Sequence, residues 1–126
     1  MLLIAVICDT RSHLTSLRNA LNEIGVRYKL EALDTDLSAL CHLSRAAEYP
    51  DLVLVNGTLT VYEAPQFLVD LKKALTLSQS CIAVMDPLEE DLQGLEQLGV
   101  SLFLRKPVSP AALKEILRHA GAHPII

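Results

Sequence analysis

The sequence lacks the features that mark a nucleic-acid-binding protein or a membrane protein. It has 11 basic and 15 acidic residues, a formal net charge of −4, and no run of five or six like charges. Direct binding of nucleic acid is therefore not expected, because the phosphates require a basic face. No apolar segment approaches the length of a membrane span, and the opening "MLLIAVIC" has no basic residues of the kind that begin a signal peptide. We expect a cytoplasmic protein that does not associate with membranes.

Cysteine is scarce, and the common motifs of nucleotide binding and catalysis are missing. The three cysteines are odd in number and widely spaced, at Cys8, Cys41 and Cys81. This spacing favours a reducing compartment over a disulfide framework. The four histidines are not spaced as metal ligands, and no glycine-rich phosphate loop or nucleophile elbow is present. We therefore predict no cofactor, no metal and no enzymatic activity.

What the sequence does contain is a regular alternation of apolar strand-like runs and amphipathic helical segments. Strands are predicted at residues 2–8, 28–33, 52–55, 81–85 and 102–105. Helical periodicity follows each of them, at residues 14–24, 36–47, 65–75, 87–99 and 110–117. Because the strands are apolar throughout, they predict one α/β domain over residues 1–126. Its core is a doubly wound, five-stranded parallel sheet with helices on both faces.

Residues with known capping preferences predict where the helices begin. Asp36 is expected to cap the second helix, and Pro65 to start the third. Ser109 as cap and Pro110 as first residue are expected to begin the last helix. The fourth helix is acidic, and Gly94 is expected to weaken its middle and leave it easy to shift.

Polar residues follow four of the predicted strands. In a doubly wound sheet, ligands collect at the carboxyl ends of the strands, near the point where the strand order reverses. The residues at these ends are Cys8-Asp9, Asn56-Gly57, Met85-Asp86 and Lys106-Pro107. We expect them to lie along one edge of the sheet.

Two segments resemble those of the receiver domains of two-component response regulators. "PDLVLVN" (residues 50–56) resembles the segment that ends in the phosphoacceptor aspartate. "GVSLFLRKPVSPAAL" (residues 99–113) resembles the segment that carries a Lys-Pro pair and the last helix. The resemblance extends over essentially the whole chain. It implies a flavodoxin-like fold with the strand order 2-1-3-4-5.

The resemblance places the functional positions of receivers on residues that have mostly lost the chemistry. We call these residues the degenerate pocket: the acidic pair falls on Cys8 and Asp9, the phosphoacceptor on Asn56, the switch hydroxyl on Met85 and the lysine on Lys106. An amide is not a nucleophile, and Mg²⁺ prefers carboxylate oxygens. The resemblance thus implies a phosphorylation-independent pseudo-receiver, a signalling and protein-interaction module of a two-component-type system. It also implies that Asn56→Asp improves Mg²⁺ binding without restoring the switch.

Several interpretations of the degenerate pocket remain open. Asn56 is either a turn former or a lock that accepts a hydrogen bond from Lys106. Asp9 and Lys106 are expected to pair and close an empty pocket. The alternative function is a sensor that uses the vacated pocket and is gated by a small ligand or by oxidation of Cys8, whose thiol pKa Asp9 would raise and Lys106 would lower. A further alternative is an atypical phosphoacceptor receiver, with Asp86 as a stand-in acid or simply as a helix cap.

The resemblance also implies a binding surface, made by the fourth helix, the fifth strand and the fifth helix. Leu102 and Phe103, the latter at the switch-aromatic position, make the fifth strand unusually apolar for the edge of a sheet. Leu92 and Leu95 lie on the neighbouring fourth helix. We expect a protein partner or a second copy of the chain to bind this surface. The competing interpretation is that Leu102 and Phe103 are ordinary core residues.

Overall fold

The computed structural model contains one parallel sheet with the strand order β2-β1-β3-β4-β5. The strands are β1 (Leu2–Ile7), β2 (Tyr28–Leu33), β3 (Leu52–Asn56), β4 (Cys81–Met85) and β5 (Phe103–Leu104). The helices are α1 (Arg11–Ile24), α2 (Asp36–Ser44), α3 (Ala64–Ala74), α4 (Leu92–Gln97) and α5 (Pro110–His119), with a 3-10 turn, η1 (Glu89–Asp91), before α4. The structure describes residues 1–45, 47–75 and 80–119. The predicted fold class and strand order are confirmed.

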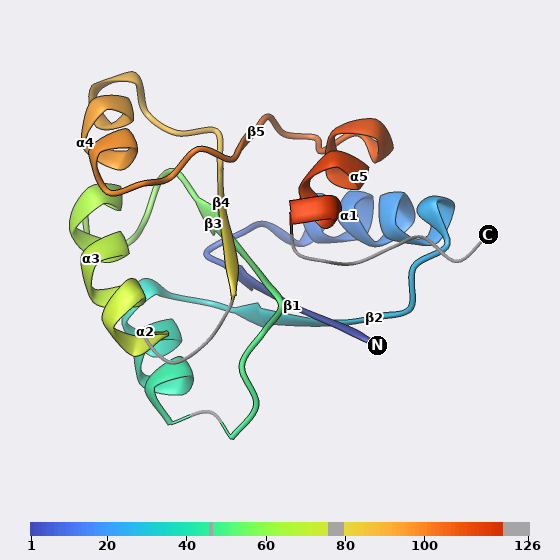
Figure 1. The fold of residues 1–126 in the computed structure, drawn as a ribbon, viewed down its shortest axis with the longest axis horizontal. Helices are drawn as coiled ribbons and strands as arrows, with labels where there is room; N and C mark the ends of the chain where they lie inside the picture. The colour runs from blue at the N-terminus through green and yellow to red at the C-terminus, as the bar shows by residue number, and fades with distance from the viewer. Residues whose placement is uncertain (46, 76–79, 120–126) are drawn as a thin grey trace.

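Helices cover both faces of the sheet. Helices α1 and α5 pack together on one face, and α2, α3 and α4 cover the other (Figure 1). Alternate residues of each strand point to opposite faces, so each strand contributes to two separate core clusters. Ile4 and Leu54 belong to the cluster under α1 and α5, whereas Val53 and Val55 belong to the cluster with Phe67 of α3. Burial on both faces explains why these strands are continuous apolar runs.

The predicted start of α5 is confirmed, α3 begins at Ala64, one residue before the predicted Pro65, and the predicted cap of α2 differs from the observed one. Ser109 caps α5, because its Oγ accepts a hydrogen bond from the backbone N–H of Ala112 at 3.1 Å. The prediction that Asp36 caps α2 is wrong. Thr35 is the cap and forms a reciprocal capping box with Ser38, while Asp36 is the first residue of the helix and is fully buried. Its carboxylate binds another segment of the chain, which overrides its capping preference.

The fourth helical segment is shorter than predicted, and α4 packs closely against the start of α3. A Cβ on Gly94 would lie 3.2 Å from Cγ of Pro65, so the glycine lets α4 approach the start of α3. Gly94 therefore has a packing role besides its expected weakening of the helix. Within the residues that the structure describes, no helix is both long and apolar enough to cross a membrane.

Candidate functional site

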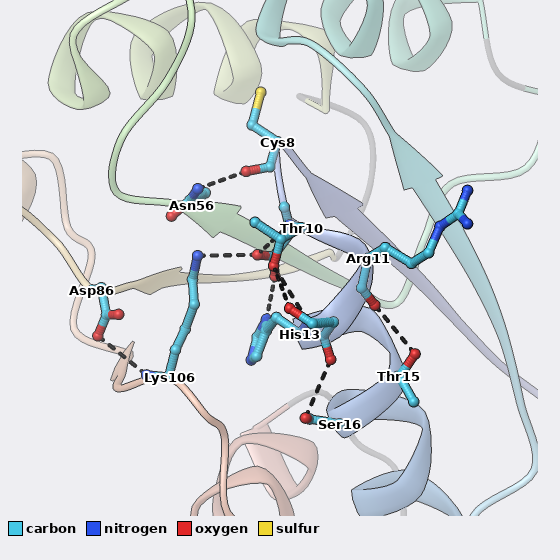
Figure 2. Close-up of polar contacts among 11 residues, drawn as sticks. Cys8, Thr10, Arg11, His13, Thr15, Ser16, Asn56, Asp86 and Lys106 are labelled. Atoms are coloured by element: carbon cyan, nitrogen blue, oxygen red, sulfur yellow. Dashed lines mark hydrogen bonds and ion pairs between the residues drawn. The ribbon is translucent and has the colours of Figure 1, made fainter.

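The side chain of Asn56 joins the carboxyl ends of β3 and β1. Its Nδ2 donates a hydrogen bond to the main-chain carbonyl of Cys8 at 2.6 Å (Figure 2). Cys8 has a φ of 59°, in the left-handed region that residues with a Cβ seldom adopt. Asn56 thus fixes a strained turn at the end of β1. The sequence predicted a lock, but the lock is a bond to Cys8 and not a bond accepted from Lys106.

Both oxygens of the Asp9 carboxylate are engaged. Lys106 Nζ lies 3.0 Å from Oδ1, and the backbone N–H of Thr10 donates to the same oxygen at 2.8 Å. His13 Nδ1 contacts Oδ2, and the Asp9 side chain is fully buried. Burial alone would raise the pKa of Asp9, but the hydrogen bonds from His13, Lys106 and Thr10 outweigh it and hold this pKa below its ordinary value. The expected Asp9–Lys106 ion pair is present in the structure.

The sequence analysis missed His13, which we assigned to no site. It lies in the first turn of α1, four residues after Asp9, and this i,i+4 spacing brings the two side chains together. The helix cap supports the arrangement, because Thr10 Oγ1 accepts a hydrogen bond from the backbone N–H of His13. The ring is 94% buried, and its Nε2 has no hydrogen-bond partner among the described residues. The spacing and the Thr10 cap were visible in the sequence and could have indicated this contact.

The ends of β4 and β5 are linked through Asp86. Its Oδ1 accepts a hydrogen bond from the backbone N–H of Lys106 at 3.1 Å. Asp86 therefore does not cap the following helix, and one of its oxygens is occupied by the Lys106 loop. Met85, which precedes it, is fully buried in the core cluster beneath α1 and α5. Met85 therefore contributes packing and offers no hydroxyl to a phosphoryl group.

The thiol of Cys8 does not belong to the pocket around Lys106. Figure 2 shows its sulfur pointing away from both Asn56 and Lys106. Burial raises the pKa of this thiol, the negative charge of Asp36 raises it further, and hydrogen bonding with Thr60 lowers it. The prediction that Asp9 and Lys106 set the pKa of Cys8 is wrong, because the side chain turns toward Asp36 and Thr60.

The position after Asn56 requires a glycine, Gly57. A Cβ at this position would lie 2.3 Å from the main-chain oxygen of Asp86, closer than two such atoms can approach. The backbone N–H of Gly57 donates to the carbonyl of Met85 at 2.7 Å. Only glycine allows the chain to leave β3 this close to the end of β4.

The predicted binding surface is partly exposed. Leu102, Phe103 and Leu92 are half-buried. Phe103 and Leu92 line a cavity of about 470 Å³ together with Asp86, Pro87, Leu104 and Arg105. Leu95 is fully buried in the core cluster beneath α3 and α4, so its assignment to an exposed surface is wrong. Its position on α4 faces the sheet and not the solvent.

The residues of the degenerate pocket do not fit Mg²⁺. Asp9 supplies a carboxylate there, but a lysine, a histidine and a backbone amide already occupy its oxygens. Proteins usually bind Mg²⁺ through one or two carboxylates whose oxygens are free, and water completes its six ligands. Throughout residues 1–45, 47–75 and 80–119, no group of three or more His, Cys, Asp or Glu side chains is placed to hold a metal ion. Of the four histidines considered at the sequence level, His123 lies outside the described residues.

Comparison with solved structures identifies the fold. The bacteriophytochrome response regulator AtBRR superposes with a TM-score of 0.76 at 20% sequence identity, covering 100% of this chain and 96% of that chain. The chain has the receiver-domain fold. The chemotaxis response regulator CheY4 of Vibrio cholerae gives a TM-score of 0.71 at 19% identity, covering 95% of this chain and 98% of that one. No protein-family model and no curated protein sequence matches.

A third similar structure shows a receiver pocket with its metal. The receiver domain of the sensor histidine kinase PA1611 from Pseudomonas aeruginosa PAO1 has a magnesium ion coordinated in its active-site cleft. It gives a TM-score of 0.75 at 20% identity and covers 95% of this chain and 98% of that one. At this identity the likeness extends to the fold alone. The chemistry of the present chain therefore has to be argued from its own side chains.

Proposed function

We propose that this chain is a pseudo-receiver, a non-enzymatic module that binds a protein partner without being phosphorylated. One observation carries the proposal: both carboxylate oxygens of Asp9, the ammonium group of Lys106 and the amide nitrogen of Asn56 are already bonded within the chain. Asp9 is held by Lys106 and His13, and Asn56 donates to the carbonyl of Cys8. The neutral amide is neither a nucleophile nor a counter-charge for a metal ion.

The charges of the pocket are balanced without a metal. In a low-dielectric site, a carboxylate is stabilised by a nearby cation and by hydrogen-bond donors. Lys106 and the donors Thr10 and His13 fill this role for Asp9, and 80% of the Lys106 side chain is withdrawn from solvent. Binding Mg²⁺ would require breaking this ion pair. Of the two carboxylates at this edge of the sheet, Asp9 has both oxygens bonded and Asp86 has one.

The redox alternative finds no support in the position of Cys8. Its sulfur points away from Lys106, and burial raises its pKa, which leaves less of the reactive thiolate at neutral pH. We also do not favour an atypical phosphoacceptor at Asp86, because one of its oxygens accepts the backbone N–H of Lys106.

A titration with Mn²⁺, a paramagnetic stand-in for Mg²⁺, tests the closed pocket. We expect no site-specific broadening of the amide signals of Asp9, Thr10 and Gly57. Lys106→Met removes the cation that competes for Asp9, and we expect broadening at Asp9 and Thr10 in that variant. Lys114→Met, which removes an exposed lysine of α5, is the matched control and should behave as the unchanged protein. Saturable broadening around Asp9 in the unchanged protein would contradict the proposal.

The partner surface that we propose lies along α4, β5 and α5. Its support is the cavity lined by Phe103 and Leu92 beside a two-residue edge strand. The occupant is a protein partner or a second copy of this chain. Sedimentation should show that Phe103→Ala and Leu92→Glu weaken any assembly, whereas Leu37→Glu on α2 leaves it unchanged. Equal assembly of all these folded variants would exclude this surface.

A further inference from the structure

Strand β2 forms an open edge of the sheet. It pairs with β1 on one side, and no strand of the described residues pairs with its other side (Figure 1). The backbone amide of Leu2 donates to the carbonyl of Arg27, and that of Cys8 donates to the carbonyl of Leu33. Because alternate residues of a strand bond to each neighbour, the odd-numbered residues of β2 direct their backbone groups to β1. The residues whose N–H and C=O groups point away from the sheet are Tyr28, Leu30 and Ala32.

This edge has few of the features that prevent an edge strand from pairing with another chain. Such strands are commonly very short, or carry a proline, a bulge or a lysine. Strand β2 has six residues, against two in β5 at the opposite edge. It contains no proline, and its register with β1 is unbroken from Tyr28 to Leu33, so no bulge interrupts it. The lysine, Lys29, is followed two residues later by an acid, Glu31.

One antiparallel register of β2 with β2 of a second copy satisfies both the backbone and the charges. In this register Leu30 faces Leu30 of the second copy, and the outward N–H and C=O groups of both strands enter the ladder. Lys29 then faces Glu31 of the second copy, twice by symmetry, at positions where opposed side chains approach most closely. A shift of the register by two residues would instead place Lys29 opposite Lys29, or Glu31 opposite Glu31.

The side chains on both faces of β2 suit this pairing. On the face toward α2, Lys29 is exposed, and Glu31 uses Oε1 to bind His42 Nε2 at 2.7 Å. A carboxylate has a second oxygen, which can accept a hydrogen bond from the lysine of the second copy. On the other face, Tyr28 and Leu30 are half-buried against the core cluster beneath α1 and α5. Pairing would bury part of the apolar surface that these two residues still expose.

We propose that β2 binds β2 of a second copy of this chain, antiparallel and in the register centred on Leu30. The two five-stranded sheets then form one continuous sheet. The contact uses the same surface on both copies, so it closes as a dimer and does not extend into a fibre. A single strand pair is a small interface, and the dimer is therefore weak and depends on concentration. Since β2 and β5 are opposite edges of the sheet, the proposal does not rest on the proposed function.

Sedimentation equilibrium of charge-reversed variants tests the register. We expect the unchanged protein to dimerise with a dissociation constant in the micromolar to millimolar range. Lys29→Glu places like charges opposite each other at both positions and should weaken the dimer at least about tenfold, as should Glu31→Lys. The double variant, Lys29→Glu with Glu31→Lys, restores both opposite-charge pairs and should restore the dimer. Arg18→Glu, at an exposed position of α1, is the matched control and should assemble as the unchanged protein does.

A proline at Ala32 tests the backbone bonds. Ala32 is exposed and its N–H points away from β1, so Ala32→Pro removes a donor to the second copy and none within the chain. We expect this variant to keep its circular dichroism spectrum and to be monomeric. In the unchanged protein, hydrogen exchange of the Leu30 amide should slow as the concentration rises.

Three results would each overturn the proposal. They are a monomer throughout the millimolar range, a dimer that Lys29→Glu leaves unchanged, and a double charge reversal that stays dissociated. The charge series decides the question even if Ala32→Pro does not fold. Assembly through the α4, β5 and α5 surface would respond to Phe103→Ala and not to Lys29→Glu, so the failure of one surface is distinguishable from the failure of the other.

Discussion

At the residue scale, the side chain of Asn56 has a structural role at the end of β1. Its Nδ2 donates to the carbonyl of Cys8, a bond that an ionised carboxylate cannot make. An aspartate there would place two acceptors within a hydrogen-bond distance of each other. The amide thus stabilises the end of β1, and it offers no nucleophilic oxygen.

We therefore expect Asn56→Asp to destabilise the fold. At pH 7 the free energy of unfolding should fall by about 1–3 kcal/mol, the cost of an unsatisfied buried partner. The loss should shrink at low pH, where a protonated carboxyl can donate to the carbonyl of Cys8. Urea unfolding at several pH values measures this, with Asn19→Asp on the exposed side of α1 as the control. Because the oxygens of Asp9 are occupied, we now predict no new Mg²⁺ site in this variant, whereas the resemblance to receivers implied improved Mg²⁺ binding. A stable variant with a new Mg²⁺ site would contradict this account.

Asp36 gives a second prediction at this scale, concerning pH. Burial would raise its pKa, but hydrogen bonds from Tyr62, Val61, Thr60 and the backbone of Leu37 outweigh this and lower it from the ordinary value of 3.8. A carboxylate with a lowered folded pKa stabilises the fold above its unfolded pKa and loses this effect as the pH falls through the folded value. Stability should therefore decrease as the pH falls below about 4, and Asp9 should contribute in the same direction.

The variant Asp36→Asn separates the contribution of Asp36 to the pH dependence of stability from that of Asp9. At pH 7 we expect it to lower the free energy of unfolding by about 1–3 kcal/mol, because an amide cannot accept all the N–H and O–H donors. Its stability should also depend less on pH than that of the unchanged protein between about pH 5 and pH 2, a range that includes the ordinary aspartate pKa of roughly 4. Asp34→Asn, outside this bonding network, is the control. A pH dependence identical to that of the unchanged protein would show that Asp36 does not carry the effect.

At the element scale, the packing of α4 determines which of its leucines a binding partner could contact. Leu95 packs into the core, whereas Leu92, the first residue of this short helix, is half-buried and lines the same cavity as Phe103. The sequence alone could not distinguish the two leucines, because the start of the helix shifted to Leu92 after a 3-10 turn.

This difference predicts unequal effects of the same substitution. Leu95→Glu should cost roughly 2–5 kcal/mol, since it removes a fully buried leucine and buries a charge. Leu92→Glu should leave the fold close to its original stability. Thermal unfolding of the two variants compares them directly. Similar melting temperatures would mean that α4 is oriented differently from the structure described here.

Element type and order were predictable, whereas side-chain direction at the strand ends was not. Continuous apolar runs and helical periodicity identified all five strands and the helices that follow them. At Cys8 the left-handed backbone turns the thiol away from Lys106, and no sequence period encodes such a turn. At α2, Thr35 and Asp36 both prefer a cap, and only the tertiary bonds of Asp36 to residues 60–62 decide between them.

At the scale of the whole molecule, the strand order brings four chain segments to one edge of the sheet. In this fold the ends of β1, β3, β4 and β5 meet, so Asp9, Asn56, Asp86 and Lys106 become neighbours although they are far apart in sequence. The similar solved structures share this frame at 18–20% identity. The fold is thus shared with these structures, and in this chain the polar side chains at this edge of the sheet bond to one another.

The most direct test of the closed pocket is the intact mass of the protein after exposure to Mg²⁺ and acetyl phosphate. A receiver domain with an intact aspartate pocket, treated in parallel, shows that the phosphodonor is active. Because Asn56 has no nucleophilic carboxylate and the oxygens of Asp9 are occupied by Lys106, His13 and Thr10, we predict an unchanged mass. A hydroxylamine-labile adduct of one phosphoryl group would contradict the account.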